Sequence, residues 1–488
     1  MSFEEILNFV NSQVWGWPML GLLLLTGLYL TFGLRLLSVV RIPYAFKQLF
    51  KKRTGNEDEG DVSPFAALMT ALSSTIGTGN IAGVAAAIAI GGPGAVFWMW
   101  MTAIVGTATK FSEGVLAVRY REIDSKGNRV GGPMYYIKNG LGPKWKWLAY
   151  TFAFFGFFAA LGTGASIQSN SVADALKSTY GLSPWITAVF IAGGAAAVII
   201  GGIKRIGVVA SSVVPIMAGL YLLAGITVII MHANAIPEAF GRIFAGAFGL
   251  QTAGTGISVG LLVLAMQKGV ARGIFSNEAG QGSAPIAHAA ARNNDPVNQG
   301  IIAMLGTIID TLIVCTITAL VILTSGVIPT ECIASPENLQ TLMTGLQPPG
   351  CDTGAPLTAS AFDASLFGWG GHIVAIGLTV FAFTTILGWS YYGERCSAFL
   401  FTEKSIPVYR ILWVLVVFAS AAAIALQEQI GNIVNLFWLM ADTLTGLMAA
   451  PNLIGIILLS PVVFKLAKEY FDKEKTARDG LVDQEDLP

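Results

Sequence analysis

Long apolar runs recur along almost the whole chain and predict its architecture. Each run is about 20 residues long, which is the length that crosses a bilayer as a helix. We predict eleven such segments, at about 15–40, 63–91, 94–120, 147–175, 184–203, 207–231, 252–291, 298–326, 367–401, 408–427 and 431–462. Because the runs are too long and too free of alternation for outer-membrane strands, the expected fold class is an all-α polytopic membrane protein.

Two of these segments are interrupted at matching places. One contains Gly77 and Gly79, and the other contains Gly280 and Gly282, 203 positions further along the chain. Two close glycines beside polar residues should unwind a helix inside an apolar run. Broken helices at corresponding positions of two halves point to the binding site of a transporter.

Composition and charge support a membrane protein and give its orientation. Only 12% of the residues are charged, about half the usual share in soluble domains, and the formal net charge of zero gives no sign of a nucleic-acid partner. With eleven crossings, 24 of the 29 Lys and Arg residues lie on one side, and only Lys177 and Arg242 lie on the other. The positive-inside rule then predicts a cell-membrane protein with its amino terminus outside and its carboxyl terminus in the cytoplasm.

One long loop, 327–366, is predicted on the external side. It contains Glu331, Glu337, Asp352 and Asp363 but no Lys or Arg. Cys332 and Cys351 also lie there, on the oxidising side of the membrane, so they either form a disulfide or remain two free thiols. The charged tail after Leu466 is expected to end a helix and continue without structure.

The first interruption has the chemistry of a site for a zwitterion and a small cation. Unwinding at Gly77 and Gly79 frees C=O groups, which attract a cation, and N–H groups, which attract a carboxylate. Thr75, Thr78 and Asn80 add short oxygen-bearing side chains beside the break. The alternative is that these glycines only allow neighbouring helices to pack closely.

Two acidic residues inside predicted spans also bear on the chemistry, because intramembrane carboxylates usually face a cavity or a partner. Glu278, in the second interruption, could contact a substrate ammonium group, ligate a cation, carry a proton, or pair with Arg272 as a structural bridge. Asp310, in the eighth segment, could belong to a cation site or make a buried hydrogen bond to another helix.

Four motifs give the chain a specific resemblance. They are TGNIAG at 78–83, GGPMYY at 131–136, RGIFSNEAGQGSAP at 272–285 and GWSYYGE at 388–394. In these the chain resembles the alanine-or-glycine:cation symporter family, the sodium:alanine symporters. The resemblance implies a LeuT-type fold, in which two inverted five-helix repeats follow one extra helix. The implied divisions are an extra helix and loop at 1–62, repeats at 63–231 and 252–462, and a cytoplasmic tail at 463–488.

The same resemblance implies a set of site residues. The substrate would be held by Thr78, Gly79, Gln168, Phe275, Ser276 and Asn277, under a cap formed by Trp389. A sodium ion would take the carbonyls of Ser73 and Ile76 and the hydroxyls of Thr384 and Thr385. A second cation position would involve Thr75, Asn80, Glu278 and Asp310. The long external loop and Gln281, where an apolar residue is expected, depart from the pattern, and neither is expected to touch the pocket chemistry.

The predicted function is secondary transport that couples sodium influx to uptake of alanine, glycine or a similarly small amino acid by alternating access. No enzymatic activity is expected, and no cofactor other than sodium as the coupling ion. The expected partners are the amino acid and the lipid bilayer, with no nucleic acid and no obligate protein partner. The alternatives are a proton-coupled carrier that uses Glu278 or Asp310, and a channel or amino-acid sensor without coupled transport.

Overall fold

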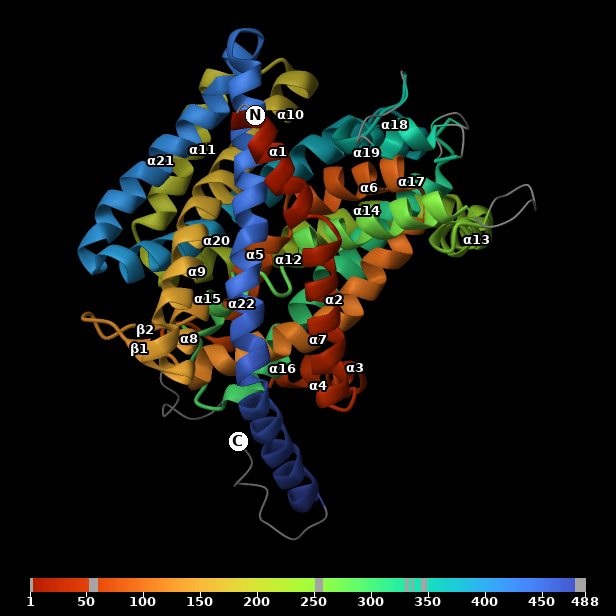
Figure 1. Ribbon diagram of the computed structural model, residues 1–488. Helices are drawn as coiled ribbons and strands as arrows, with labels where there is room; N and C mark the ends of the chain where they lie inside the picture. Colours follow the sequence, from red (N-terminus) through yellow and green to blue (C-terminus); the bar gives the residue numbers. More distant parts are fainter. Residues whose placement is uncertain are drawn as a thin grey trace.

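The computed structural model describes residues 3–51, 60–250, 258–329 and 350–478, and within 330–349 residues 332, 334, 335, 338–343 and 348. Helices make up nearly all of this described part (Figure 1). Its one sheet is a hairpin of two short antiparallel strands, β1 (Glu122–Ile123) and β2 (Arg129–Val130).

By length and composition, eight helical stretches of the described residues can cross a membrane: Glu4–Gly33, Pro143–Tyr180, Gly202–Met231, Val259–Asn277, Pro296–Thr324, Gly370–Phe401, Glu403–Leu426 and Leu436–Thr476. A bent pair, Pro64–Thr75 with Gly79–Gly91, adds a ninth. The two remaining predicted segments correspond to α7 (Gly94–Arg119) and the shorter apolar helix α11 (Pro184–Ile199). Each of the eleven predicted segments therefore contains helix.

The helices within these stretches have the following bounds: α1 Phe3–Val14, α2 Trp17–Gly33, α5 Pro64–Thr75, η1 Gly79–Gly83, α6 Val84–Gly91, α9 Lys146–Ala159, η3 Ala160–Ile167, α10 Gln168–Tyr180, α12 Gly202–Met231, α14 Val259–Asn277, α16 Pro296–Thr307, η5 Ile308–Cys315, α17 Thr316–Thr324, α20 Gly370–Phe401, α21 Ile406–Ala422 and α22 Gln427–Arg478. The elements η1, η3 and η5 are π-helical, a form that is often found at functional sites.

Five shorter helices of the described residues lie outside the predicted spans: α4 Ile42–Leu49, α8 Pro133–Leu141, α13 Ile236–Ala247, α18 Leu339–Met343 and α19 Gly354–Leu366. Two more, α3 Leu37–Val40 and α15 Ala284–His288, lie at the ends of the first and seventh predicted segments. Hydropathy over windows of about 20 residues does not detect helices of this length. One of them, α13, is joined to α7 by a hydrogen bond of 3.1 Å from the Trp98 indole to the Ala247 carbonyl.

The two ends of the molecule differ in charge. In Figure 1, α1, α18 and α19 lie at one end, and the hairpin, α4, α8 and the carboxyl-terminal end of α22 lie at the other. The second end, called here the basic end, carries most of the Lys and Arg residues that the sequence analysis grouped on one side. Residues 479–488 of the predicted tail lie outside the described residues.

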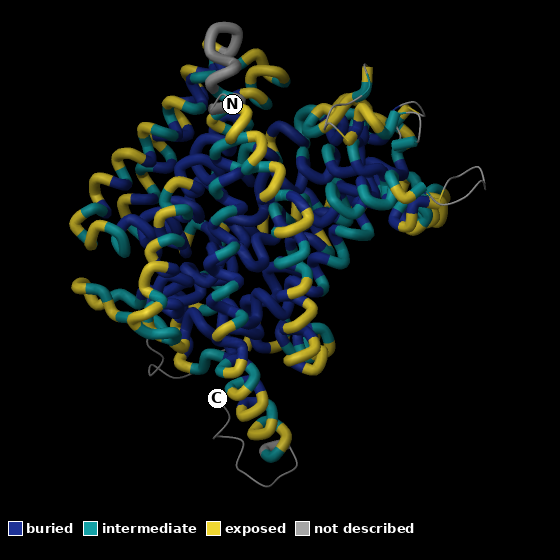
Figure 2. Tube along the Cα trace, in the orientation of Figure 1, coloured by how far each residue is buried: buried dark blue, intermediate teal, exposed yellow. Residues whose placement is uncertain are grey.

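Burial follows the same plan. In Figure 2 buried residues fill the centre, and exposed ones lie on the outer helices. Large apolar side chains are exposed on these helices, among them Phe190 on α11, Leu220 on α12 and Leu415 on α21. Exposed apolar surface of this kind suits contact with lipid.

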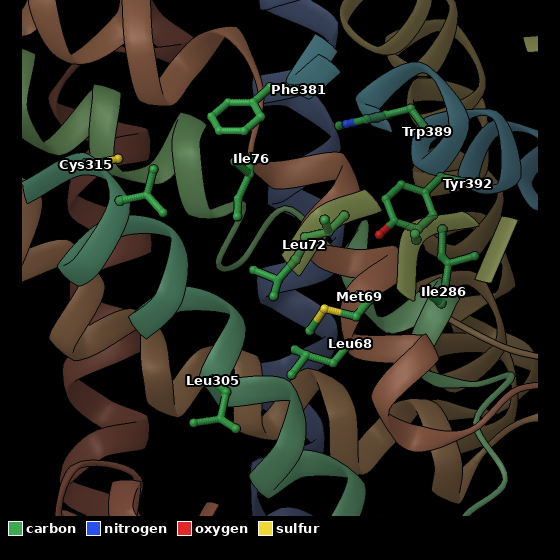
Figure 3. Close-up of a cluster of buried hydrophobic side chains, with 14 of the residues drawn as sticks. Leu68, Met69, Leu72, Ile76, Ile286, Leu305, Cys315, Phe381, Trp389 and Tyr392 are labelled. Atoms are coloured by element: carbon green, nitrogen blue, oxygen red, sulfur yellow. The ribbon is translucent and has the colours of Figure 1, made fainter. Parts of the chain in front are cut away.

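The broken helix α5 runs through the centre of the structure. Every residue from Ala67 to Thr75 is buried. Figure 3 shows Leu68 and Leu72 of α5 in one apolar cluster with Leu305 from α16 and Phe381 from α20. Since α5 is packed on all sides, the break at its carboxyl-terminal end is held in a fixed place.

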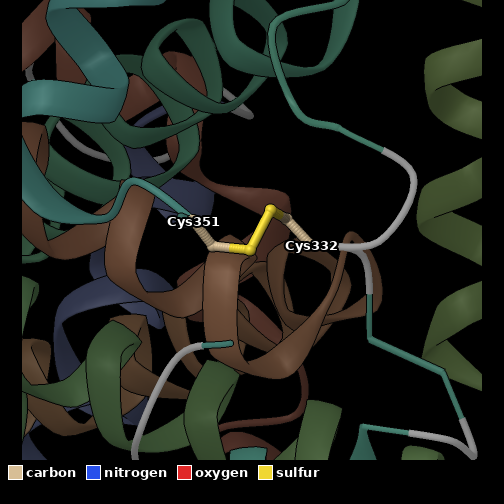
Figure 4. The surroundings of a disulfide bond; sticks show 2 residues. All are labelled: Cys332 and Cys351. Carbon is tan, nitrogen blue, oxygen red and sulfur yellow. A yellow bond between two sulfur atoms is a disulfide. The ribbon is translucent and has the colours of Figure 1, made fainter. Parts of the chain in front are cut away.

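The loop of residues 327–366, which the sequence analysis predicts on the external side, contains a disulfide. Cys332 and Cys351 are bonded to each other, with their Cα atoms 5.6 Å apart (Figure 4). The alternative of two free thiols is therefore wrong. Two of the loop's acidic residues, Glu331 and Glu337, lie outside the described residues, whereas Asp363 accepts a hydrogen bond from the Gly370 N–H at the start of α20.

Candidate functional site

The first helix break lies between α5 and η1, where the helix axis bends by 55°. Ile76 is extended, with φ −75° and ψ 96°. The Gly77 N–H, which would bond the Ser73 carbonyl in a continuous helix, donates instead to Asn80 Oδ1 at 2.9 Å. A Cβ at Gly77 would lie 2.7 Å from Thr385 Oγ1, so only glycine fits there without a shift.

The second break follows α14 and is longer. Three residues with positive φ lie in it, Glu278 (55°), Gly280 (88°) and Gly282 (83°), before α15 begins at Ala284. Pro285 occupies the first turn of α15, as predicted. Both predicted interruptions are therefore present.

Asp310 joins the two breaks. Its carboxylate, on η5, accepts hydrogen bonds of 2.7 Å each from Asn80 Nδ2, Ser276 Oγ and Thr311 Oγ1. Asn80 belongs to the first break, and Ser276 precedes the second. Asp310 thus makes the buried hydrogen bonds that the sequence left as one alternative.

A small cavity of about 20 Å³ lies where the two breaks meet. Its lining comes from five separate parts of the chain: Ser74, Thr75, Gly77, Thr78 and Gly79; Thr163 and Gln168; Phe275, Glu278 and Gln281; Thr385 and Trp389; and Thr445. This volume holds about one water molecule, so any larger ligand must displace the lining side chains.

Two glutamines line the cavity with unpartnered oxygens. Gln168 donates its Nε2 to the Thr163 carbonyl at 3.3 Å, and Gln281 donates its Nε2 to the Ile274 carbonyl at 3.1 Å. Both side chains are buried, and neither Oε1 has a hydrogen-bond partner among the described residues. The cavity therefore offers two acceptors to a ligand that carries N–H or O–H groups.

Glu278 forms one wall of the cavity together with Trp389. Its Oε1 accepts a hydrogen bond of 3.0 Å from Trp389 Nε1, and its Oε2 accepts one from Ser283 Oγ. Among the described residues no ion pair joins Glu278 to Arg272. The guanidinium of Arg272 lies over the Phe275 ring, 5.2 Å from its centroid, so the structural bridge, which the sequence left as one of four alternatives, is absent.

Hydroxyl and carbonyl oxygens gather beside the first break. Thr384 Oγ1 and Thr385 Oγ1 both donate to the Phe381 carbonyl, at 2.9 and 3.0 Å. Thr385 Oγ1 also lies 3.4 Å from the Ile76 carbonyl. The Phe381 carbonyl is a member of this cluster that the sequence analysis did not single out, because a carbonyl inside an unbroken helix leaves no mark in the sequence.

A much larger cavity, here called the vestibule, lies beyond the small one. Its volume is about 670 Å³, and its walls include Asn11, Trp15, Arg272, Gly354 and Asp442. Thr78 and Phe275 line both cavities. The vestibule therefore connects the site with the end of the molecule that carries α1 and α19.

Ion pairs join the hairpin, α20 and α21 at the basic end. Arg395 lies 2.6 Å from Glu394 and 3.5 Å from Asp124 of the hairpin, and Arg410 also pairs with Glu394 at 2.6 Å. Burial alone would raise the pKa of Asp124, but hydrogen bonds from Asn128 and other neighbours and the charge of Arg395 lower that pKa below its usual value. Asp124 is therefore charged at neutral pH, which favours its pairing with Arg395.

The predicted site residues occupy three places. The small cavity is lined by Thr75, Thr78, Gly79, Gln168, Phe275, Glu278, Thr385 and Trp389. Asn80 and Ser276 lie with Asp310 in a second cluster, where both donate to its carboxylate. Asn277 lies beside this cluster, and its Nδ2 donates to Thr311 Oγ1. The remaining three, Ser73, Ile76 and Thr384, lie at the end of α5 and on the facing part of α20.

The small cavity also contains residues that the sequence analysis did not assign to it. They are Ser74, Gly77, Thr163, Gln281 and Thr445. Gln281 is the informative one, because it was noted as a departure and expected to lie away from the pocket. The unexpected polar residue within the second interruption was the available signal.

Comparison with known proteins gives one family over almost the whole chain. The family model described as the sodium:alanine symporter family matches residues 1–484. The chain is similar to the sodium/alanine symporter AgcS of Methanococcus maripaludis, with 49% identity over 477 residues, 97% of this chain and 99% of that protein. It is also similar to YrbD of Bacillus subtilis, a putative sodium/proton-dependent alanine carrier protein, with 37% identity over 478 residues, 98% and 94% of the two chains.

A solved structure supports the fold. The crystal structure of MhsT in complex with L-phenylalanine matches 84% of this chain and 98% of that chain, with a TM-score of 0.53 and 11% sequence identity. At this identity the likeness concerns the fold alone, and it confirms the predicted LeuT-type architecture.

Proposed function

The chain belongs to the sodium:alanine symporter family, and on that premise we propose that it couples sodium influx to the uptake of a small neutral amino acid. The observation that carries the proposal is the small cavity between two broken helices, which shares Thr78 and Phe275 with a wider vestibule toward one end of the molecule. A site that one side of a membrane reaches at a time is what alternating access requires.

The substrate carboxylate lies at the N–H groups of Thr78 and Gly79. These groups begin the second half of the broken helix, where N–H groups lack partners within the helix and the dipole favours an anion. The substrate ammonium group donates to Gln168 Oε1, which would be 3.3 Å from a Cβ at Gly77 and is therefore close to the same break. Carbonyls at Phe275, Ser276 and Asn277 complete the ammonium site.

The side chain of the substrate faces Trp389. The indole is buried and held by its hydrogen bond to Glu278, so it limits the length of side chain that the cavity admits. This wall and the small volume favour alanine, glycine or an amino acid of similar size.

Sodium binds beside the first break. The Ser73 carbonyl loses its helical partner because the Gly77 N–H turns to Asn80. The ion takes this carbonyl together with the Ile76 carbonyl and the hydroxyls of Thr384 and Thr385, and the Phe381 carbonyl adds a fifth oxygen. Sodium is a hard cation, and a site made only of oxygens suits it as it suits other hard cations.

A second cation position lies around Asp310. The carboxylate is buried and accepts three hydrogen bonds, and among the described residues no Lys or Arg pairs with it. A cation there would rest on Asp310 and Asn80 and reach Ser276, with Thr75 and Glu278 nearby on the cavity wall. The negative charge of the Asp310 carboxylate would attract sodium to the point where both broken helices meet.

The two five-helix repeats, 63–231 and 252–462, move against each other around this site, and the extra helix and loop of 1–62 and the tail of 463–488 lie outside them. The basic end faces the cytoplasm of a cell membrane and the vestibule faces outside, in keeping with the charge bias. The membrane potential supplies about 2.3 kcal/mol per sodium ion at 100 mV, enough for roughly 50-fold accumulation.

Uptake of radiolabelled L-alanine into proteoliposomes tests the proposal. An inward sodium gradient should produce a transient accumulation that equal sodium on both sides does not. Uptake driven by a pH gradient without sodium would favour the proton-coupled carrier, and binding without accumulation would favour a sensor.

A further inference from the structure

Gln281 is a buried polar residue that the proposed binding of the amino-acid backbone does not use. Only 1% of its surface is exposed, and it lines the small cavity. A buried acceptor without a partner is costly. Its oxygen therefore needs a donor that the described residues do not supply.

The orientation of the Gln281 amide is set by its surroundings. The Ile274 carbonyl, at the end of α14, can only accept a hydrogen bond, and Gln281 Nε2 lies 3.1 Å from it. Turning the amide over would place two oxygens against each other. The Nε2 group thus caps α14, and Oε1 is left for the cavity.

The two unpartnered oxygens come from different parts of the chain, so the proposed binding mode assigns them to different parts of the amino acid. Gln168 lies beside the first break, where the proposed carboxylate site is. In an α-amino acid the ammonium nitrogen and the carboxylate carbon are bonded to the same Cα, so the ammonium group must lie near this break as well. Gln281 belongs to the second break, as does Glu278, which holds Trp389. The side chain of the substrate is the part that reaches this wall.

The wall on that side offers acceptors. Glu278 accepts from Trp389 and Ser283, the Trp389 N–H is already donated, and Gln281 presents its free oxygen. A methyl side chain leaves that oxygen without a partner, and a carboxylate side chain would face other acceptors. A short hydroxyl group satisfies the oxygen and fits beside Trp389.

We propose that Gln281 is the specificity-determining residue of the side-chain pocket and selects a small amino acid with a hydroxyl donor, serine, over an apolar one of the same size. The inference rests on the proposed function, since it concerns the substrate of the same site. Sites that hydrogen-bond a substrate hydroxyl discriminate strongly against the analogue that lacks it.

The experiment compares L-serine with L-2-aminobutyrate, in which a methyl group replaces the hydroxyl at the same size. Sodium-driven uptake into proteoliposomes is measured for both, with L-alanine in parallel. We expect kcat/KM for serine to exceed that for aminobutyrate about tenfold. In Gln281→Met, which keeps the length and loses the acceptor, the ratio should fall to about one.

Gln168→Met is the matched control. It should lower uptake of both substrates together and keep their ratio, because Gln168 contacts the ammonium group that both share. A ratio near one in the unmodified protein, or a ratio that Gln281→Met leaves unchanged, would overturn the inference.

If Gln281→Met fails to fold, a serine-to-aminobutyrate ratio near one in the unmodified protein still overturns the inference. Alanine uptake separates the two proposals. If alanine accumulates and the serine preference is absent, only the inference about Gln281 is wrong. If no amino acid accumulates with sodium, the proposed function falls and the inference with it.

Discussion

The two helix breaks satisfy their backbone groups in different ways. In the first, among the described residues, side chains make two bonds to the backbone of the turn: the Gly77 N–H donates to Asn80 Oδ1 at 2.9 Å, and Thr385 Oγ1 donates to the Ile76 carbonyl at 3.4 Å. The N–H groups of Thr78 and Gly79 have no side-chain partner there. In the second, side chains bond the backbone at four places. The Ala279 N–H donates to Asn277 Oδ1, and the Gly282 N–H donates to Glu113 Oε1. The Gly280 carbonyl accepts from Asn452 Nδ2, and the Ile274 carbonyl accepts from Gln281 Nε2.

This difference assigns different tasks to the two breaks. Backbone groups left without protein partners are free to bind a ligand or an ion, whereas backbone groups bonded by side chains are held in place. This difference supports the proposed placement of the carboxylate and sodium at the first break. The second break forms a wall and presents side chains, among them Glu278 and Gln281, to the cavity.

The largest effect is expected from filling the first break. Gly77→Ala places a Cβ 2.7 Å from Thr385 Oγ1 and 3.3 Å from Gln168 Oε1. Both groups must move, and a displacement of about 1 Å at a site of this kind costs about 100-fold. We expect kcat/KM for alanine uptake to fall by that factor or more.

Gly377→Ala is the control for this prediction. It lies on α20, where the nearest atom to an added Cβ is Ile81 Cδ1 at 3.7 Å, an ordinary contact. Its uptake should match that of the unmodified protein. If Gly77→Ala also transports normally, the first break is not the binding element.

A smaller effect is expected from Asp310→Asn, which weakens the connection between the breaks. The carboxylate accepts from Asn80, Ser276 and Thr311, but an amide has one acceptor oxygen, so its NH₂ group must face at least one donor. Leaving a buried donor unpaired costs about 2 kcal/mol, which corresponds to about 30-fold. We expect this loss in kcat/KM, together with a higher sodium requirement.

Asp363→Asn makes the same chemical change away from the site. Among the described residues Asp363 accepts one side-chain hydrogen bond, from the Gly370 N–H to Oδ1, and an asparagine oxygen can retain it. This variant should transport normally. A sodium requirement that Asp310→Asn leaves unaltered would contradict a cation position at Asp310.

The sequence predicted the spans and both breaks. Apolar runs of about 20 residues indicate the spans, and pairs of close glycines within such runs indicate the breaks. It did not predict which way residues beyond a break face. Gln281 follows two residues with positive φ, Glu278 and Gly280, so helical periodicity no longer indicates its direction. Arg272 and Glu278 are close in sequence, but α14 ends at Asn277 and Arg272 faces the vestibule.

The sequence also did not predict which distant segments contact each other. The cavity takes Thr163 from η3 and Thr445 from α22, which hydrogen-bond to each other at 2.7 Å across 282 positions. No local pattern marks such a pair. Short helices such as α13 and α19 were missed because their apolar faces are too brief for a membrane window.

The smallest effect is expected in the second break, which tests whether Glu278 acts through its charge. Glu278→Gln can keep both bonds, since its oxygen accepts from Trp389 and its NH₂ donates to the Ser283 hydroxyl, which also accepts. Bonds to a charged group are about twice as strong as neutral ones, so we expect about a tenfold loss in kcat/KM with sodium dependence retained. Trp389→Phe removes the same bond from the other side, and because the two residues contact each other, the double variant should lose less than the product of the two losses. A proton-driven uptake that Glu278→Gln abolishes would instead make Glu278 a proton carrier and give the second break the role assigned here to the first.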